Sequence, residues 1–112
     1  MLGHKSSYRL IVNHIFKILT TMAIYHIKNR RGEHREDNWI RFWEEKTGLD
    51  AGQCHVLGCL KDAEDGAHVN LVDSDDKKTY IVPMCHQCNC QFGQEFYVVG
   101  PLVSVDGNTI LP

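Results

Sequence analysis

Short stretches in which apolar and polar residues alternate predict β-strands along this chain. Residues 23–29, AIYHIKN, place Tyr25 and Ile27 on one face of such a strand. Residues 65–72, DGAHVNLV, and residues 79–84, TYIVPM, lie on either side of the polar run DSDDKK. The pattern therefore predicts one strand in the front half and, later, a β-hairpin with a solvated tip.

Helical spacing of apolar residues is clearest from Trp39 to about Thr47, directly before Gly48. Either Asp37 or Asn38 can cap this helix at its N-terminus. The apolar residues lie close enough to form one anchoring stripe: Trp39, Ile40, Phe42 and Trp43.

Further elements are predicted near the C-terminus. Residues 89–96, NCQFGQEF, could hold a short helix behind the last cysteines. The strand-like runs YVV, LVSV and TIL follow, and Asp106-Gly107 between the last two runs predicts a tight hairpin.

The apolar run RLIVNHIFKIL, residues 9–19, keeps helical spacing, but a membrane-spanning helix needs about 20 such residues. Asn13, His14 and Lys17 interrupt the run, and no small-x-small cleavage pattern follows it. We therefore expect no membrane insertion. We interpret residues 1–21 as an extension that is disordered or foreign to the native protein, with Met22 as the alternative initiator.

Length and charge indicate one domain with an uneven charge distribution. The chain has 112 residues and a formal net charge of -2, and we assign residues 22–112 to one domain with its core at about 52–97. Residues 1–50 carry nine of the twelve Lys and Arg residues against six acidic residues, whereas residues 51–112 carry three against eight. Contact with nucleic acid is therefore expected only through the front half.

The chain contains five cysteines, all between residues 54 and 90. An odd number leaves one thiol over from any complete set of disulfides. The pairs Cys54/Cys59 (C-x4-C) and Cys85/Cys88 (C-x2-C) fit metal ligation better than a disulfide framework. A reducing, cytoplasmic location is the expectation that follows.

The two cysteine pairs predict one structural zinc site, because Zn2+ binds four thiolates at tetrahedral corners. Gly58 allows the first pair to turn beneath the metal, and the 25 residues between the pairs are enough for a β-hairpin. Knuckle, hairpin and a ligand pair on a helix form the layout of a treble-clef zinc finger. We expect a small α+β fold of this kind, with a flanking N-terminal strand and helix and a C-terminal hairpin.

Three neighbouring residues could each replace one cysteine as a ligand: His55, His86 and Cys90. Cys90 has the weakest claim, because another C-x-C pairing would strain the turn. We expect Cys90 to be a core residue behind the site.

The string CHVLGC … DGAHVNL … YIVPMCHQCN, within residues 54–92, resembles the zinc-bound form of the HNH endonuclease family, also called the ββα-metal fold. In this resemblance His68 matches the family's general-base histidine, which activates water against a phosphodiester. Asn89 matches the last motif position, where the family often binds the catalytic Mg2+ or Mn2+ ion. The resemblance implies that His68 and Asn89 lie close together beside the zinc site. A hydrogen-bonded structural histidine is the simpler alternative for His68.

Two positions depart from the family pattern. A metal-binding Asp frequently precedes the histidine, and here that residue is Ala67; the family's middle Asn falls on Tyr80. Mg2+ prefers hard oxygen ligands, which are therefore scarce. Substitutes are available only at the predicted hairpin tip: Asp73, Asp75 and Asp76. These departures favour a non-catalytic binding module, or a purely structural zinc domain in a larger assembly, over a nuclease of variant motif.

A basic run before the predicted helix supplies candidate nucleic-acid contacts. Arg30, Arg31 and Arg35 could bind phosphate, with Trp39 and Trp43 stacking on bases. A solvated turn with the tryptophans in the core is the simpler alternative. We expect a zinc-binding module for DNA, RNA or a protein partner, with a metal-dependent endonuclease as the alternative, and the pattern indicates no oligomeric state.

Overall fold

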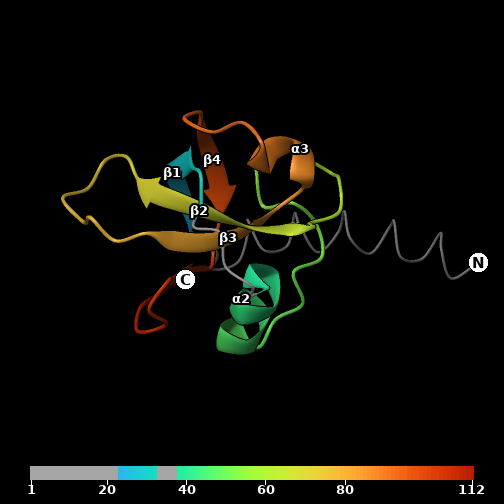
Figure 1. Cartoon of the computed structure of the whole chain (residues 1–112), viewed down its shortest axis with the longest axis horizontal. Coiled ribbons are helices and arrows are strands. Elements are labelled where there is room, and N and C mark those ends of the chain that lie inside the picture. The colour runs from blue at the N-terminus through green and yellow to red at the C-terminus, as the bar shows by residue number, and fades with distance from the viewer. Residues whose placement is uncertain (1–22, 33–37) are drawn as a thin grey trace, which may run out of the picture.

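The computed structural model describes residues 23–32 and 38–112 and has an α+β fold. Its centre is an antiparallel sheet of six strands in the order β4-β1-β2-β3-β5-β6. Figure 1 labels the strands β1 to β4 of this sheet. The strands are β1 (Ile24–Arg30), β2 (Asp65–Leu71), β3 (Tyr80–Met84), β4 (Glu95–Val99), β5 (Leu102–Ser104) and β6 (Ile110–Leu111). The helices of the described part are α2 (Trp39–Thr47) and α3 (His86–Asn89).

The central hairpin is confirmed. Strands β2 and β3 pair antiparallel, with Ala67 opposite Val82. The predicted front strand, β1, lies against the other edge of β2, with Arg30 opposite His68. Its alternation also holds, because Ile27 is fully buried in β1.

Helix α2 begins and ends where the sequence predicts. The Asn38 side chain caps it by accepting a hydrogen bond from the Arg41 backbone N–H at 3.2 Å. Gly48 ends it with a φ of 73°, in the left-handed region. Trp43 is fully buried, and its indole N–H donates to the Pro101 carbonyl at 2.8 Å. The tryptophan therefore anchors the helix on the sheet, as the simpler interpretation expected.

The two faces of the sheet have different partners, with α2 on one side and α3 on the other (Figure 1). The α2 face packs Ile81 and Val103 against Trp43 and Ala51. Gly66 of β2 also lies under α2; a Cβ atom there would be 2.6 Å from the Trp39 Cβ atom, so a larger residue would push the helix away.

The opposite face, which we call the cysteine face, carries the larger buried cluster. Its members include Ile27, Ala67, Val69, Val82, Met84, Val98 and Leu102, together with Cys54 and Cys85. Ala67 and Val69 point to this face because side chains alternate along β2. The cysteines are thus part of the core that lies opposite α2.

The segment after β3 differs from the prediction. The helix predicted within residues 89–96 is wrong: α3 lies earlier, at His86–Asn89, and β4 begins at Glu95. The Asn29 N–H donates to the Gln94 carbonyl and the Gly93 N–H donates to the Asn29 carbonyl, each at 2.8 Å. These bonds draw the chain into the sheet beside β1, which ends the helix after one turn.

The C-terminal hairpin is confirmed. Strands β5 and β6 pair with Leu102 opposite Leu111, and the turn between them contains Asp106. The Asp106 carboxylate accepts hydrogen bonds from the Ser104 hydroxyl at 2.6 Å and from the Asn108 N–H at 2.9 Å. The sequence signal and the hydrogen bonds therefore agree on this turn.

Some predictions lie outside the described residues. They concern residues 1–21, Met22, Arg35 and the alternative cap Asp37. Within residues 23–32 and 38–112, the helices are too short to cross a membrane.

Candidate metal centre

The first cysteine pair lies on a tight turn before β2. The Cys54 N–H donates to the Lys61 carbonyl at 2.8 Å, and the Cys59 N–H donates to the Val56 carbonyl at 3.0 Å. Gly58 has a φ of 85°, a conformation that other residues rarely adopt. The turn therefore depends on this glycine, as the sequence predicts for a zinc knuckle.

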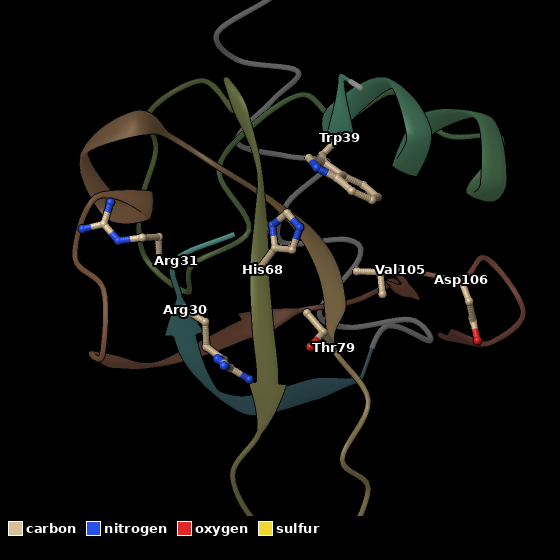
Figure 2. Close-up of a pocket in the computed structure, with 7 residues that line it drawn as sticks. All are labelled: Arg30, Arg31, Trp39, His68, Thr79, Val105 and Asp106. Carbon is tan, nitrogen blue, oxygen red and sulfur yellow. The ribbon is translucent and has the colours of Figure 1, made fainter. Parts of the chain in front are cut away.

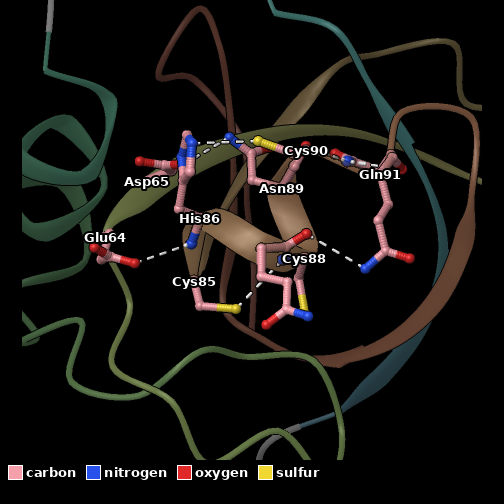
Figure 3. Close-up of polar contacts among 10 residues, drawn as sticks. Glu64, Asp65, Cys85, His86, Cys88, Asn89, Cys90 and Gln91 are labelled. Atoms are coloured by element: carbon pink, nitrogen blue, oxygen red, sulfur yellow. Dashed lines mark hydrogen bonds and ion pairs between the residues drawn. The ribbon is translucent and has the colours of Figure 1, made fainter.

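The second cysteine pair lies where β3 passes into α3. Cys85 caps the helix, and its Sγ atom accepts a hydrogen bond from the Cys88 N–H at 3.4 Å (Figure 3). This contact places both thiols at the start of a single helical turn. The hairpin β2–β3 brings this turn beside the first pair.

The four paired cysteines form one group. The Sγ atoms of Cys54, Cys59, Cys85 and Cys88 all lie within 4.8 Å of one another, and those of Cys59 and Cys85 are 3.9 Å apart. Four sulfurs bound to a tetrahedral zinc ion at ~2.3 Å would be separated by about 3.8 Å. The group could therefore hold a metal ion, and its size fits a zinc–thiolate site.

The protonation of these thiols depends on their surroundings. Burial raises the pKa of Cys54 far above its ordinary value. Burial, together with the Cys85 thiol, raises the pKa of Cys88 to about 12. Burial acts on Cys85 as well, but hydrogen bonds from the Cys88 backbone and from neighbouring thiols outweigh it and lower its pKa. The raised pKa values favour neutral thiols when no metal is bound. A metal ion would displace the thiol protons and offset the charge of the thiolates that bind it.

The three alternative ligands lie outside the group. His55 is buried, with Nδ1 at 2.8 Å from the Val99 carbonyl and its ring edge-on to Trp43. The Nε2 atom of His86 and the Sγ atom of Cys90 contact each other at 3.3 Å. The expectation that Cys90 is a core residue is wrong: it is exposed, at the C-cap position directly after the single turn of α3.

His68 lies on the α2 face, at a pocket of about 440 Å³ (Figure 2). It is 9% exposed, and its ring contacts the Trp39 ring edge-on with centroids 4.9 Å apart. The lining residues are Arg30, Arg31, Trp39, His68, Thr79, Val105 and Asp106. The pocket therefore combines two of the predicted basic residues with the predicted histidine.

The two described arginines of the basic run are both exposed but differ in direction. The Arg30 guanidinium donates to the Asn70 side-chain oxygen at 3.0 Å, along the sheet. The Arg31 guanidinium lies over the Phe92 ring, 4.5 Å from its centroid. Arg30 and Arg31 both line the pocket, but their guanidinium groups have different partners.

Asn89 lies on the cysteine face, away from His68. Its side-chain amide donates to the Asp65 carboxylate at 3.0 Å. Asp65 and His68 are three positions apart on β2, so their side chains point to opposite faces of the sheet. The expectation that His68 and Asn89 lie close together beside the zinc site is therefore wrong.

The positions that depart from the family pattern hold core residues. Ala67 and Tyr80 are both fully buried. The Tyr80 hydroxyl donates to Asp76 at 2.5 Å, and Asp73 lies 3.2 Å from the His26 imidazole. These two acids therefore already have partners at the hairpin.

Comparisons with models of protein families, with curated proteins and with solved structures found no match to this chain. The resemblance to the HNH family therefore rests on the quoted residues alone. The four-cysteine group has separate support, from the geometry of the fold.

The sequence analysis missed two residues that organise α3. Asn29 is fully buried, and its amide donates to the carbonyls of Asn89 at 2.8 Å and Gln91 at 3.2 Å. The Asp65 carboxylate contacts both Asn89 and His86. The sequence did contain a signal for Asn29. It falls on the same strand face as Tyr25 and Ile27, where an apolar residue is expected, and a polar residue there indicates a buried hydrogen bond.

Proposed function

We propose that this chain is a zinc-binding module of treble-clef type that binds nucleic acid without cutting it. The observation that carries the proposal is the group of four cysteine thiols within 4.8 Å of one another. Sulfur ligands favour Zn2+ over Mg2+, Ca2+ or Mn2+, which prefer oxygen.

The treble-clef assignment is supported by the order of the elements. The knuckle with Cys54 and Cys59, the hairpin β2–β3 and the turn α3 follow one another along the chain. Helix α3 is short for such a fold, at four residues. A bound zinc ion would supply the stability that one helical turn lacks, since structural zinc sites contribute on the order of 10 kcal/mol.

Nucleic-acid binding is supported by the charges beside the pocket on the α2 face. Lys28, Arg30 and Arg31 are exposed on or next to β1. Cationic side chains bind phosphate, and the Trp39 ring at the same pocket offers an aromatic surface. A protein partner is the competing possibility and is the outcome that remains if nucleic acid does not bind.

Fluorescence anisotropy with labelled single-stranded DNA and RNA tests this function. We expect binding that weakens with added salt, and a salt slope reduced by roughly 0.7 for each phosphate contact removed by Arg30→Ala and Arg31→Ala. Arg41→Ala is the matched control, because Arg41 pairs with Glu45 on α2 at 3.4 Å and does not line the pocket. Failure to bind either nucleic acid at low salt would exclude this function and leave the protein partner.

The nuclease alternative is not favoured. His68 and Asn89 lie on opposite faces of β2, so the two side chains cannot act on one metal-bound phosphate. We expect no cleavage of plasmid DNA with Mg2+ or Mn2+. Cleavage that disappears in both His68→Ala and Asn89→Ala would show that this exclusion is mistaken.

A further inference from the structure

Three side chains outside the four-cysteine group form a chain of contacts between the start of β2 and the α3 turn (Figure 3). The Cys90 Sγ atom lies 3.3 Å from His86 Nε2. On the other side of the same ring, His86 Nδ1 lies 2.8 Å from the Asp65 carboxylate. This is the order found in catalytic triads: the imidazole is the base that activates the nucleophilic thiol, and the carboxylate orients the imidazole.

Local hydrogen bonds hold each member of this chain. The Cys90 N–H donates to the His86 carbonyl at 3.0 Å, which keeps the two side chains on neighbouring positions of one turn. The His86 N–H donates to Glu64 Oε1 at 3.2 Å. The same Asp65 oxygen that faces the imidazole also accepts from Asn89 at 3.0 Å. The arrangement therefore follows from the start of β2 and the backbone of α3.

Cys90 is also the thiol that a reagent reaches first. Of the five cysteines, Cys54 and Cys85 are buried, Cys59 and Cys88 are half-buried in the metal group, and Cys90 is exposed. Reactive cysteines are accessible and lie beside a basic group, whereas buried ones are inert.

We propose that Cys90 is a thiol-exchange site that forms a mixed disulfide with small disulfide molecules, with His86 as general base and Asp65 as positioning residue. The Cys90 sulfur attacks one sulfur of the small disulfide while its proton passes to His86 Nε2. The S–S bond of the reagent breaks, and the departing sulfur takes the proton from His86. One disulfide replaces another, and the small disulfide is the sole oxidant.

Disulfide exchange suits this surface better than acyl transfer. Acyl transfer needs preorganised donors for an oxyanion, whereas attack on a disulfide sulfur needs only a nucleophile, a base and open access. The acidic side chains of Glu64 and Asp65 next to the site disfavour anionic reagents, so an uncharged disulfide is the suitable probe. The site is independent of the partner that the zinc module binds.

The test uses the zinc-loaded full chain and bis(2-hydroxyethyl) disulfide at one fixed pH, with adducts followed by intact-mass and peptide-mapping mass spectrometry. We expect one adduct per chain, on Cys90, and none in Cys90→Ser, with the zinc content unchanged in both. His86→Gln should slow the exchange on the order of tenfold, because an unassisted thiol reacts slowly at neutral pH. Asp65→Asn should slow it less, and Asp65→Glu should restore part of the rate. Gln91→Ala, on the same segment, is the matched control and should react like the wild type.

Equal rates for the wild type and His86→Gln would overturn the proposal, as would adducts that form first on the zinc ligands. Loss of zinc in Cys90→Ser would also overturn it, since Cys90 would then be a metal ligand. If His86→Gln does not fold, the wild-type chain provides the comparison. Cys90 should then react faster in the folded protein than in the same chain unfolded in urea, and a slower folded rate would contradict the proposal.

Discussion

Tyr80 has a structural role in this chain. The resemblance to the HNH family aligns it with that family's middle Asn, but the ring is fully buried in β3. Its hydroxyl reaches the hairpin and donates to Asp76 at 2.5 Å. Burial, and then the bond to the Asp76 carboxylate, raise the pKa of Tyr80 to about 12. The side chain thus links the core to the loop of the β2–β3 hairpin, and its hydroxyl is bonded to Asp76 instead of orienting a histidine.

The raised pKa of Tyr80 predicts a loss of stability in alkali. Its folded pKa of about 12 lies above the unfolded value near 10, so the folded state favours the neutral phenol. The stabilisation is fully present below about pH 10 and is lost as the pH rises through about 12. Urea unfolding across this range, with ultraviolet titration of tyrosinate, should show a flatter pH dependence in Tyr80→Phe. Tyr97→Phe, at an exposed site, is the control. A pH dependence of stability in Tyr80→Phe as steep as that of the wild type would contradict the assignment.

Residue-level prediction succeeded where the signal was local. The spacing of Cys54, Cys59, Cys85 and Cys88 is a property of two short strings, and the fold brings these thiols together. Asn29 and Asp65 were missed because their partners lie far away in the sequence, 60 positions in the case of Asn29 and Asn89. No periodicity within one element reports such a pairing.

Among the elements, α3 depends most on contacts from elsewhere. It has four residues, and the buried amide of Asn29 on β1 donates to the carbonyls of Asn89 and Gln91 at its C-terminal end. A single turn is too short to be stable alone. The side chain of Asn29 therefore links β1 to the segment that carries the second cysteine pair.

Replacing Asn29 should weaken the fold markedly. Asn29→Ala leaves two carbonyls without this donor, and we expect a loss of about 2 kcal/mol in the free energy of unfolding. Asn70→Ala is the matched control, since its amide donates to the Lys78 carbonyl at an exposed site, and it should cost less than about 1 kcal/mol. Urea unfolding of the zinc-loaded proteins measures both. Equal losses of unfolding free energy in Asn29→Ala and Asn70→Ala would show that the link from Asn29 to α3 is not important.

The close packing of α2 against β2 at Gly66 gives a second prediction. In Gly66→Ala the new Cβ atom would lie 2.6 Å from the Trp39 Cβ atom, so helix and strand must separate. We expect a loss of roughly 1 to 3 kcal/mol, as for other overpacked sites. The zinc content should not change, because Gly66 faces α2 and the thiols lie on the opposite face. An unchanged stability would mean that α2 adjusts without cost.

Element-level prediction was accurate where the ends of an element have their own chemistry. Helix α2 has a capping Asn38 and a terminal Gly48, and its bounds were predicted from them. The helix expected within residues 89–96 was wrong, because backbone bonds from Asn29 hold residues 93 and 94 in the sheet. Strand pairing across the chain outweighed a weak local preference.

In the whole molecule, the cysteine group lies where separate parts of the chain meet. The knuckle before β2 and the turn after β3 both contribute thiols, and Cys54 and Cys85 also belong to the buried cluster of the cysteine face. A small domain has a total stability of roughly 5 to 15 kcal/mol, which is comparable with the contribution of one structural zinc ion.

Removal of the metal should therefore unfold the part of the chain around the site. Chelation of the proposed zinc ion should abolish the dispersed amide signals of residues from about Cys54 to Phe96 in NMR spectra. The physical reason is that four separate thiols, without a shared metal ion, cannot hold the knuckle against α3. Retention of a native-like spectrum by the chelated protein would show that the core suffices without metal.

Metal analysis combined with X-ray absorption spectroscopy tests the central claim most directly. The account predicts one zinc ion per chain with four sulfur neighbours at ~2.3 Å. Cys85→Ser should lose this ion, whereas Cys90→Ser should keep it, because Cys90 lies outside the group of four thiols. A metal-free native protein, or a zinc ion retained in Cys85→Ser and lost in Cys90→Ser, would contradict the account.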